Sequence, residues 1–190
     1  MKTKLLLLTA VIASAMAGNA LSMNKDEYKT QKDRISSEYK ANRAKCSSLK
    51  ANAKDICVSQ AKGSEKVAKA ELEAQYKPDA KQDQKVRMAK ADAAYDTAKE
   101  KCDDLTGNTK DVCVKDAKAA HVKAKEDAKV AKVSADNSGN RSDKVNAAKK
   151  DANEEKREAE YKAVKERCDS LSGAAKDNCQ NDAKVKFGMK

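Results

Sequence analysis

Six cysteines are the residues in this chain whose spacing most clearly indicates chemistry. They form three pairs with ten residues between partners: Cys46/Cys57, Cys102/Cys113 and Cys168/Cys179. Paired thiols can form a structural disulfide, exchange disulfides with other thiols or, with further ligands, bind a metal. Structural zinc sites use closer spacings such as CxxC, and the chain has a single histidine. We therefore expect three short-range disulfides, and redox-active thiol pairs are the alternative.

Each cysteine pair lies in one copy of a repeated motif, Y-x6-C-x2-L-x4-KD-x-C-x3-AK, at residues 39–62, 95–118 and 161–184. The tyrosine, first cysteine and leucine of each copy share one face of a helix. They predict a packing seam between two helices. The seam residues outside the cysteines are Tyr39, Leu49, Tyr95, Leu105, Tyr161 and Leu171.

The second copy shows most clearly how the motif turns. Gly107 follows the last seam residue, where the C-terminus of a helix favours a left-handed residue. Asn108 and Asp111 then have the spacing of a helix N-terminus. Gly173 is the corresponding turn residue of the third copy. The pattern predicts a helical hairpin with a disulfide across its arms near the tip.

The composition limits the core. Aromatic residues make up 3% of the chain, tryptophan is absent, and alanine dominates the apolar residues. Alanine is the best helix former but buries little apolar surface. We expect an all-α fold of three disulfide-closed αα-hairpin repeats, with long helices and a thin alanine-rich seam, loosely packed or elongated.

The boundaries of the repeats follow from caps and breakers. Asn24 or Asp26 can cap the first helix, Pro78 interrupts the second, and SADNSGNRSD is a turn-rich stretch. We expect His121 on a solvent-facing side of its helix. The predicted segments are a signal peptide at 1–22, hairpin repeats at 24–77 and 78–133, a linker at 134–142 and a third hairpin repeat at 143–190.

The first 22 residues have the features of a secretory signal peptide. Lys2 and Lys4 precede a short apolar run at 5–13, and small residues offer cleavage after Ala17 or Ser22. The run is shorter than the roughly 20 residues that span a bilayer. We expect a processed periplasmic protein that does not span the membrane, and this compartment favours disulfides.

The charge predicts a solvated helical surface with some affinity for anions. Lysine and arginine total 41 and aspartate and glutamate 30, a net charge of +11 that falls to +9 without Lys2 and Lys4. The two signs alternate at helical spacing along the chain, which neutralises much of the charge locally. We expect contacts with anionic envelope surfaces, either lipid or polysaccharide, or with client proteins. Export argues against nucleic acid as a partner.

No catalytic motif is present in the sequence. There is no P-loop, no GxGxxG and no HExxH, and one histidine cannot serve repeated catalytic sets. The carboxylates have basic neighbours, which lower a pKa instead of raising it. We expect a protein that is not an enzyme and has no cofactor or metal.

Several segments resemble a family of small exported Gram-negative proteins that often carry a TolA-like or cell-envelope-biogenesis label. They include MNKDEYK, KGSEKVAKAELEAQYKPD, AYDTAKEKCDDLTGNTKDVCVKDAKAAHVKAKEDAK and AKVKFG. The chain shares with TolA only its Ala/Lys-rich helical character. The resemblance implies an exported, helical envelope protein. A weaker likeness to desiccation-protective helical proteins rests on runs such as AHVKAKEDAKVAK.

These observations lead to three hypotheses about function. The first is a non-enzymatic periplasmic helical repeat protein that binds or stabilises envelope components, with stress protection as its setting. The second is a thiol–disulfide redox protein that uses the three cysteine pairs. The third is a helical scaffold or oligomerisation module, in which the chain associates with itself.

Overall fold

The computed structural model describes residues 23–136 and 139–189. The predicted signal peptide at 1–22 lies outside the described residues. The elements in chain order are α1 (Lys25–Lys45), η1 (Cys46–Ser48), α2 (Ala51–Tyr76), α3 (Ala80–Cys102), α4 (Gly107–Ala135), α5 (Arg141–Cys168) and α6 (Gly173–Phe187).

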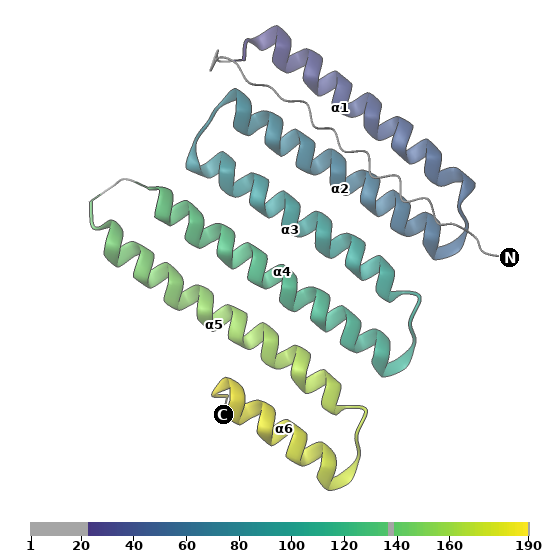
Figure 1. The fold of residues 1–190 in the computed structure, drawn as a ribbon, viewed down its shortest axis with the longest axis vertical. Helices are drawn as coiled ribbons and strands as arrows, with labels where there is room; N and C mark the ends of the chain where they lie inside the picture. The colour runs from purple at the N-terminus through teal and green to yellow at the C-terminus, as the bar shows by residue number, and fades with distance from the viewer. Residues whose placement is uncertain (1–22, 137–138, 190) are drawn as a thin grey trace, which may run out of the picture.

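The helices lie side by side in a single layer and alternate in direction (Figure 1). Within the described ranges, each α-helix packs only against the helices before and after it in the chain. The pairs α1/α2, α3/α4 and α5/α6 are hairpins, and their three closed tips lie along one edge of the layer (Figure 1). The predicted all-α fold of disulfide-closed hairpins is therefore confirmed, and the hairpins form a row instead of a bundle.

The core is a set of narrow seams between neighbouring helices. Only Ile35, Leu72 and Phe187 are buried apolar residues larger than alanine or cysteine among the described residues. The other buried apolar residues are Cys46, Ala61, Ala91, Cys102, Ala128, Ala152, Ala163, Cys168 and Ala183. Small side chains let helices approach closely but supply little hydrophobic stabilisation.

Local sequence signals set the helix ends. Asn24 accepts hydrogen bonds from the backbone N–H groups of Asp26 and Glu27, and the Glu27 carboxylate accepts one from Asn24 N–H, which completes a capping box. Helix α2 ends before Pro78, and Asp79 caps α3 through Gln82 N–H at 2.7 Å. Helix α4 ends at residue 135 and α5 begins at residue 141, so the connection between them is shorter than the predicted linker at 134–142.

The hairpins contact one another through a close approach of α2 and α3. A Cβ atom built on Gly63 would lie 2.8 Å from the Cβ of Ala93 and 3.3 Å from its Cα. Gly63 is buried and lies in the middle of α2, where a glycine is otherwise unfavourable. Its missing side chain is what allows the first two hairpins to pack together at this point.

The two outer flanks of the row differ in character. On α1, the exposed residues Thr30, Ser37 and Ala41 occupy the repeat positions at which α3 presents Val86, Ala93 and Thr97. On α6, Val185 occupies the repeat position of Gly63 and is 82% exposed. The α6 flank therefore exposes an apolar side chain, whereas the α1 flank presents mostly polar ones.

None of the helices in the part of the chain that the structure describes has an apolar stretch long enough to cross a membrane.

We expect Gly63→Ala to destabilise the protein, although alanine favours a helix by about 1 kcal/mol over glycine. The new methyl group meets Cβ and Cα atoms of Ala93 that cannot rotate away, and overpacking of this kind typically costs about 1–3 kcal/mol. Urea unfolding followed by circular dichroism measures the difference. Gly139→Ala is the control, since a Cβ there meets nothing within 4 Å. A Gly63→Ala protein more stable than the wild type contradicts the close approach.

Candidate functional site

The three disulfides connect the arms of the three hairpins, as the sequence predicted. Cys46–Cys57, Cys102–Cys113 and Cys168–Cys179 have Cα–Cα distances of 5.6, 5.6 and 5.7 Å. The first cysteine of each pair is completely buried, and its partner is half-buried. Among the described residues no cysteine is free.

The turn at each tip depends on one residue with a positive φ angle. Gly107 and Gly173 have φ values of +56° and +54°, and Ala51 takes φ +48° at the same place in the first copy. These residues begin the return helices α2, α4 and α6. The prediction that Gly107 ends the outgoing helix is wrong in its detail, because α3 already ends at Cys102. Ala51 takes the strained conformation without the freedom of glycine, at a cost of about 1–2 kcal/mol.

An asparagine in each of the first two tips binds the next hairpin. Asn52 Nδ2 donates to the backbone carbonyl of Glu100 at 2.8 Å, and Asn108 Nδ2 donates to that of Glu166 at 3.0 Å. The third copy has Ala174 at this position. The predicted capping role of Asn108 is wrong, because Thr106 is the N-cap of α4 and makes no side-chain cap. The signal in the sequence was the loss of asparagine in the last copy.

An ion pair spans the turn in the second and third tips. Lys110 Nζ lies 2.8 Å from Asp103 Oδ1, and Lys176 Nζ lies 2.8 Å from Asp169 Oδ1. The hydrogen bond to Asp103 raises the pKa of Lys110, and the hydrogen bond from Lys176 lowers the pKa of Asp169. The Asp169 pair therefore contributes above the ordinary carboxyl pKa and is lost as pH falls through the lowered value. Both pairs are exposed, so each adds little to stability.

Aromatic rings bridge the arms of the hairpins away from the tips. Tyr95 stacks on His121 with ring centroids 4.7 Å apart, and Tyr161 meets Phe187 at 6.3 Å. His121 Nε2 lies 2.6 Å from Asp92 Oδ1, and its side chain is 10% exposed. The prediction that His121 faces solvent is wrong, because its ring lies between the arms, where the third hairpin has a phenylalanine.

The first hairpin uses a different pair of rings. Tyr28 and Tyr76 have centroids 4.6 Å apart, near the open end of the hairpin. The Tyr28 hydroxyl donates to Glu73, and this hydrogen bond is the main reason that the pKa of Tyr28 is raised. Tyr39, the motif tyrosine of this copy, is half-buried.

The three motif leucines do not pack in the seams. Leu49, Leu105 and Leu171 are 40%, 36% and 43% exposed. The prediction that these leucines pack in the seams is therefore wrong. Each follows the last turn of the outgoing helix, where no further helix covers the tip. The seams therefore end at the cysteines.

The potential metal ligands and the groups with shifted pKa values are dispersed over the described residues. No group of three or more histidine, cysteine, aspartate or glutamate side chains there could hold a metal ion. The groups with clearly shifted pKa values are Tyr28, Lys110 and Asp169, which belong to separate structural contacts. The tips are thus clamps that hold hairpins closed and attach each hairpin to the next.

Comparison with protein-family models, with curated proteins and with solved structures gives no match for this chain.

We expect Asn108→Ala to lower the free energy of unfolding by about 0.5–1.5 kcal/mol, the usual contribution of one hydrogen bond. The change removes the bond to the Glu166 carbonyl and loosens the third hairpin from the second. Urea unfolding gives the magnitude, and amide hydrogen exchange in α5 shows where protection is lost. The matched control is Ala174→Asn at the third tip, where the described residues include no further hairpin to bind, so it should change neither. Equal effects of the two substitutions would contradict the proposed contact.

We expect replacement of Cys102 and Cys113 by alanine to destabilise the protein by about 3 kcal/mol, because the bridge closes a short loop in the unfolded chain. Urea midpoints of the oxidised proteins measure the effect. When both proteins are fully reduced, the difference should shrink to the packing contribution of two thiols. A double variant as stable as the oxidised wild type would show that the bridge is not structural.

Proposed function

We propose that this chain is an exported, non-enzymatic helical repeat protein that binds and stabilises anionic components of the cell envelope. The observation that supports this most is the single layer of helices (Figure 1). Because no second layer covers them, the described helices leave both faces of the array open to partners. An enzyme instead needs groups gathered in a concave, water-excluding site.

The disulfides support the proposed compartment. Three bridges with no free cysteine among the described residues suit an oxidising environment. The signal-peptide features of residues 1–22 and the resemblance to exported Gram-negative proteins agree with the periplasm. In this proposal the bridges keep the array intact outside the cytoplasm, where such a thin core gives limited stability.

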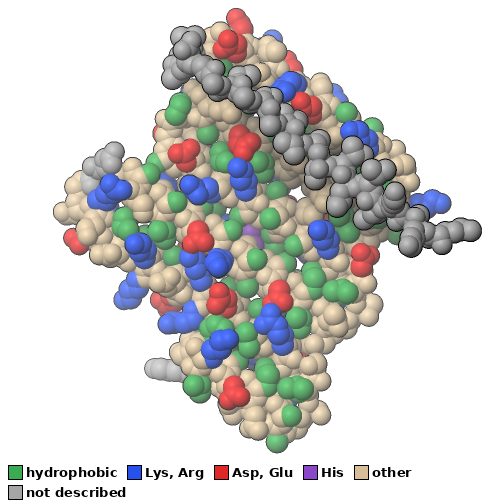
Figure 2. Space-filling view, in the orientation of Figure 1, with side chains coloured by type: hydrophobic (Ala, Val, Ile, Leu, Met, Phe, Trp, Pro, Cys, Tyr) green, Lys and Arg blue, Asp and Glu red, His purple; other side chains and the backbone are tan. Residues whose placement is uncertain are grey.

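The surface chemistry suits weak binding of anions at many points. Lysine and arginine side chains are spread over the face shown in Figure 2, with acidic and apolar side chains between them. Many of the charges form exposed ion pairs, such as Lys66–Asp96 at 3.6 Å. Lys62 and Lys99 border a polar depression between α2 and α3 that also contains Asp55, Asp96 and Glu100, so charges of both signs meet there. The excess of positive charge would attract anionic lipid or polysaccharide without a single deep site.

The complete burial of one cysteine in each bridge supports a structural role over the redox hypothesis. Cys46, Cys102 and Cys168 have no exposed surface, whereas redox-active cysteines are typically accessible and lie in electropositive surroundings. The redox hypothesis predicts rapid exchange of all three bridges with glutathione in the folded protein. We expect slow exchange unless urea is added.

Sedimentation with lipid vesicles tests the proposed function. We expect the processed, oxidised protein to bind vesicles that contain phosphatidylglycerol at low salt and to dissociate toward 0.5 M salt, since screening shortens the range of electrostatic attraction. Vesicles of phosphatidylcholine alone are the lipid control. Absence of binding, or binding that salt does not change, would contradict the proposal.

The same assay shows whether the array is needed. Reduced and alkylated protein has the same sequence without the bridges, so it should bind more weakly if the ordered layer presents the lysines together. Equal binding by both forms would assign the effect to net charge alone.

A further inference from the structure

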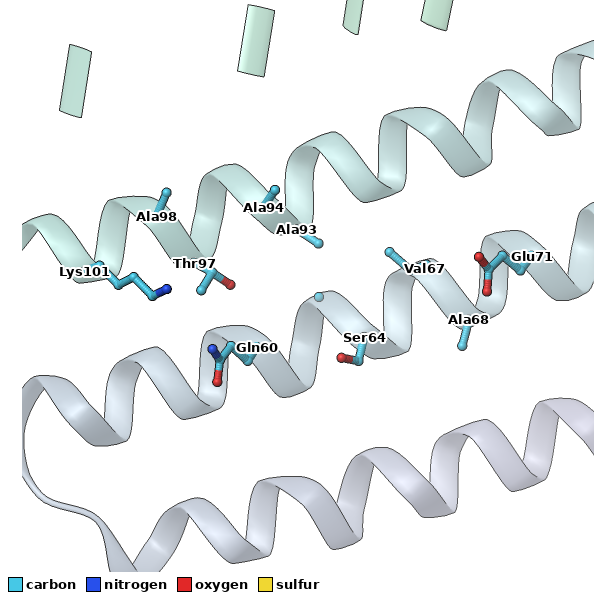
Figure 3. Close-up of a pocket in the computed structure, with 11 residues that line it drawn as sticks. Gln60, Ser64, Val67, Ala68, Glu71, Ala93, Ala94, Thr97, Ala98 and Lys101 are labelled. Atoms are coloured by element: carbon cyan, nitrogen blue, oxygen red, sulfur yellow. The ribbon is translucent and has the colours of Figure 1, made fainter. Parts of the chain in front are cut away.

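A groove runs between α2 and α3 on one face of the layer and has a volume of about 620 Å³ (Figure 3). Its middle is lined by Val67 on α2 and by Ala93 and Thr97 on α3, and its two sides by Ser64, Ala68, Ala94 and Ala98 (Figure 3). The groove exists because the close Gly63–Ala93 contact holds the helices together while the residues above it are too small to fill the surface.

Long polar side chains mark both ends of the groove. At the end near the tip are Gln60 and Lys101, and at the other end Glu71 pairs with Lys90 at 2.8 Å. Gln60 and Glu71 are eleven residues apart, which is about 16 Å along a helix. A groove of this length is short for a docked helix. It suits a single aliphatic chain lying along the groove.

The next contact between hairpins shows what the groove lacks. At the positions of Gln60 and Lys101, the α4/α5 contact has Asp116 and Arg167, which form an ion pair. The far-end pair Glu71–Lys90 likewise has a counterpart in Asp127–Lys156. Of these two ion pairs of the α4/α5 contact, the α2/α3 contact has an equivalent only of Asp127–Lys156. Among the described residues, no carboxylate pairs with the Lys101 ammonium.

Two positions of the groove also carry larger, charged side chains in the α4/α5 contact. Val67 and Ala94 correspond to Lys123 and Glu160, so charged side chains stand where the groove has small or apolar ones. An apolar floor combined with an unpaired cation at one end indicates an amphiphile with a negative head.

We propose that the α2–α3 groove binds a fatty acid, with its carboxylate on Lys101 and its aliphatic chain between the helices, over Thr97, Ala93 and Val67. The carboxylate takes the place that Asp116 occupies beside Arg167 in the next repeat. The volume lies within the range of small-ligand sites, about 300–1,000 Å³. This site is separate from the dispersed surface binding proposed above and does not depend on it.

Titration calorimetry with laurate below its micelle concentration tests the site. We expect saturable binding to the wild type and a loss of about tenfold or more in affinity for Gln60→Asp, which gives Lys101 the internal partner found in the next repeat. Lys101→Gln should lose a similar factor. Ala94→Glu, which copies Glu160, should abolish binding by placing a long charged side chain at the side of the apolar groove. Because these positions are exposed or already carry such residues in another repeat, circular dichroism should show an unchanged fold.

Two controls separate this site from general attraction. Lys99→Gln removes a neighbouring charge that borders the other depression and should leave laurate affinity unchanged. Dodecanol, which has the same chain without the carboxylate, should bind more weakly than laurate. Equal loss with Lys99→Gln, equal affinity for dodecanol, or wild-type affinity in Gln60→Asp would each overturn the proposal. Vesicle binding by Gln60→Asp should persist, so failure of the groove and failure of the proposed function can be told apart.

Discussion

The arms of each hairpin are held together by a covalent bridge because their seams contain so little apolar volume. Burial of one methylene-sized group contributes about 0.8 kcal/mol, and most of the buried apolar residues offer only an alanine methyl or a cysteine sulfur. One disulfide that closes a loop of this size contributes about 3 kcal/mol in the chain-entropy model. The tips therefore supply stabilisation that a larger core would otherwise provide, and a single layer of helices becomes sufficient.

The same constraint explains the contacts between hairpins. Helices with alanine seams stabilise one another only if they approach closely, and Gly63 against Ala93 is the extreme case. Close approach also brings the tip asparagines within reach of the next outgoing helix, where Asn52 and Asn108 find carbonyl groups. The third copy has Ala174 at the position of these asparagines. The contacts between hairpins therefore depend on residues that differ from copy to copy.

The repeated features of the fold could be predicted from the sequence, and the features that differ between copies could not. Equal cysteine spacing in three copies identified the bridges, and Pro78 with Asp79 identified the break between α2 and α3. Helical periodicity assigns a residue to a face without showing which neighbour covers that face. For this reason periodicity predicts Leu105 in a seam that ends before it, and it predicts His121 in solvent although His121 stacks on Tyr95. Side-by-side packing of the hairpins depends on alanine and glycine contacts, which carry almost no periodic signal.

Differences between equivalent positions are the most informative part of such a molecule. The cysteines that close the tips are the same in every copy, because every hairpin needs its arms held together. Positions on the open faces have no such task, so the change from Gln60 to Asp116 or from Ala94 to Glu160 is not required by the hairpin fold. Within an otherwise regular array, these substitutions give the α2–α3 contact an open apolar groove and an unpaired lysine, while the α4–α5 contact has an ion pair at the equivalent place. Specific binding should therefore be sought where the copies differ, and the common framework of bridges and seams holds that surface in place.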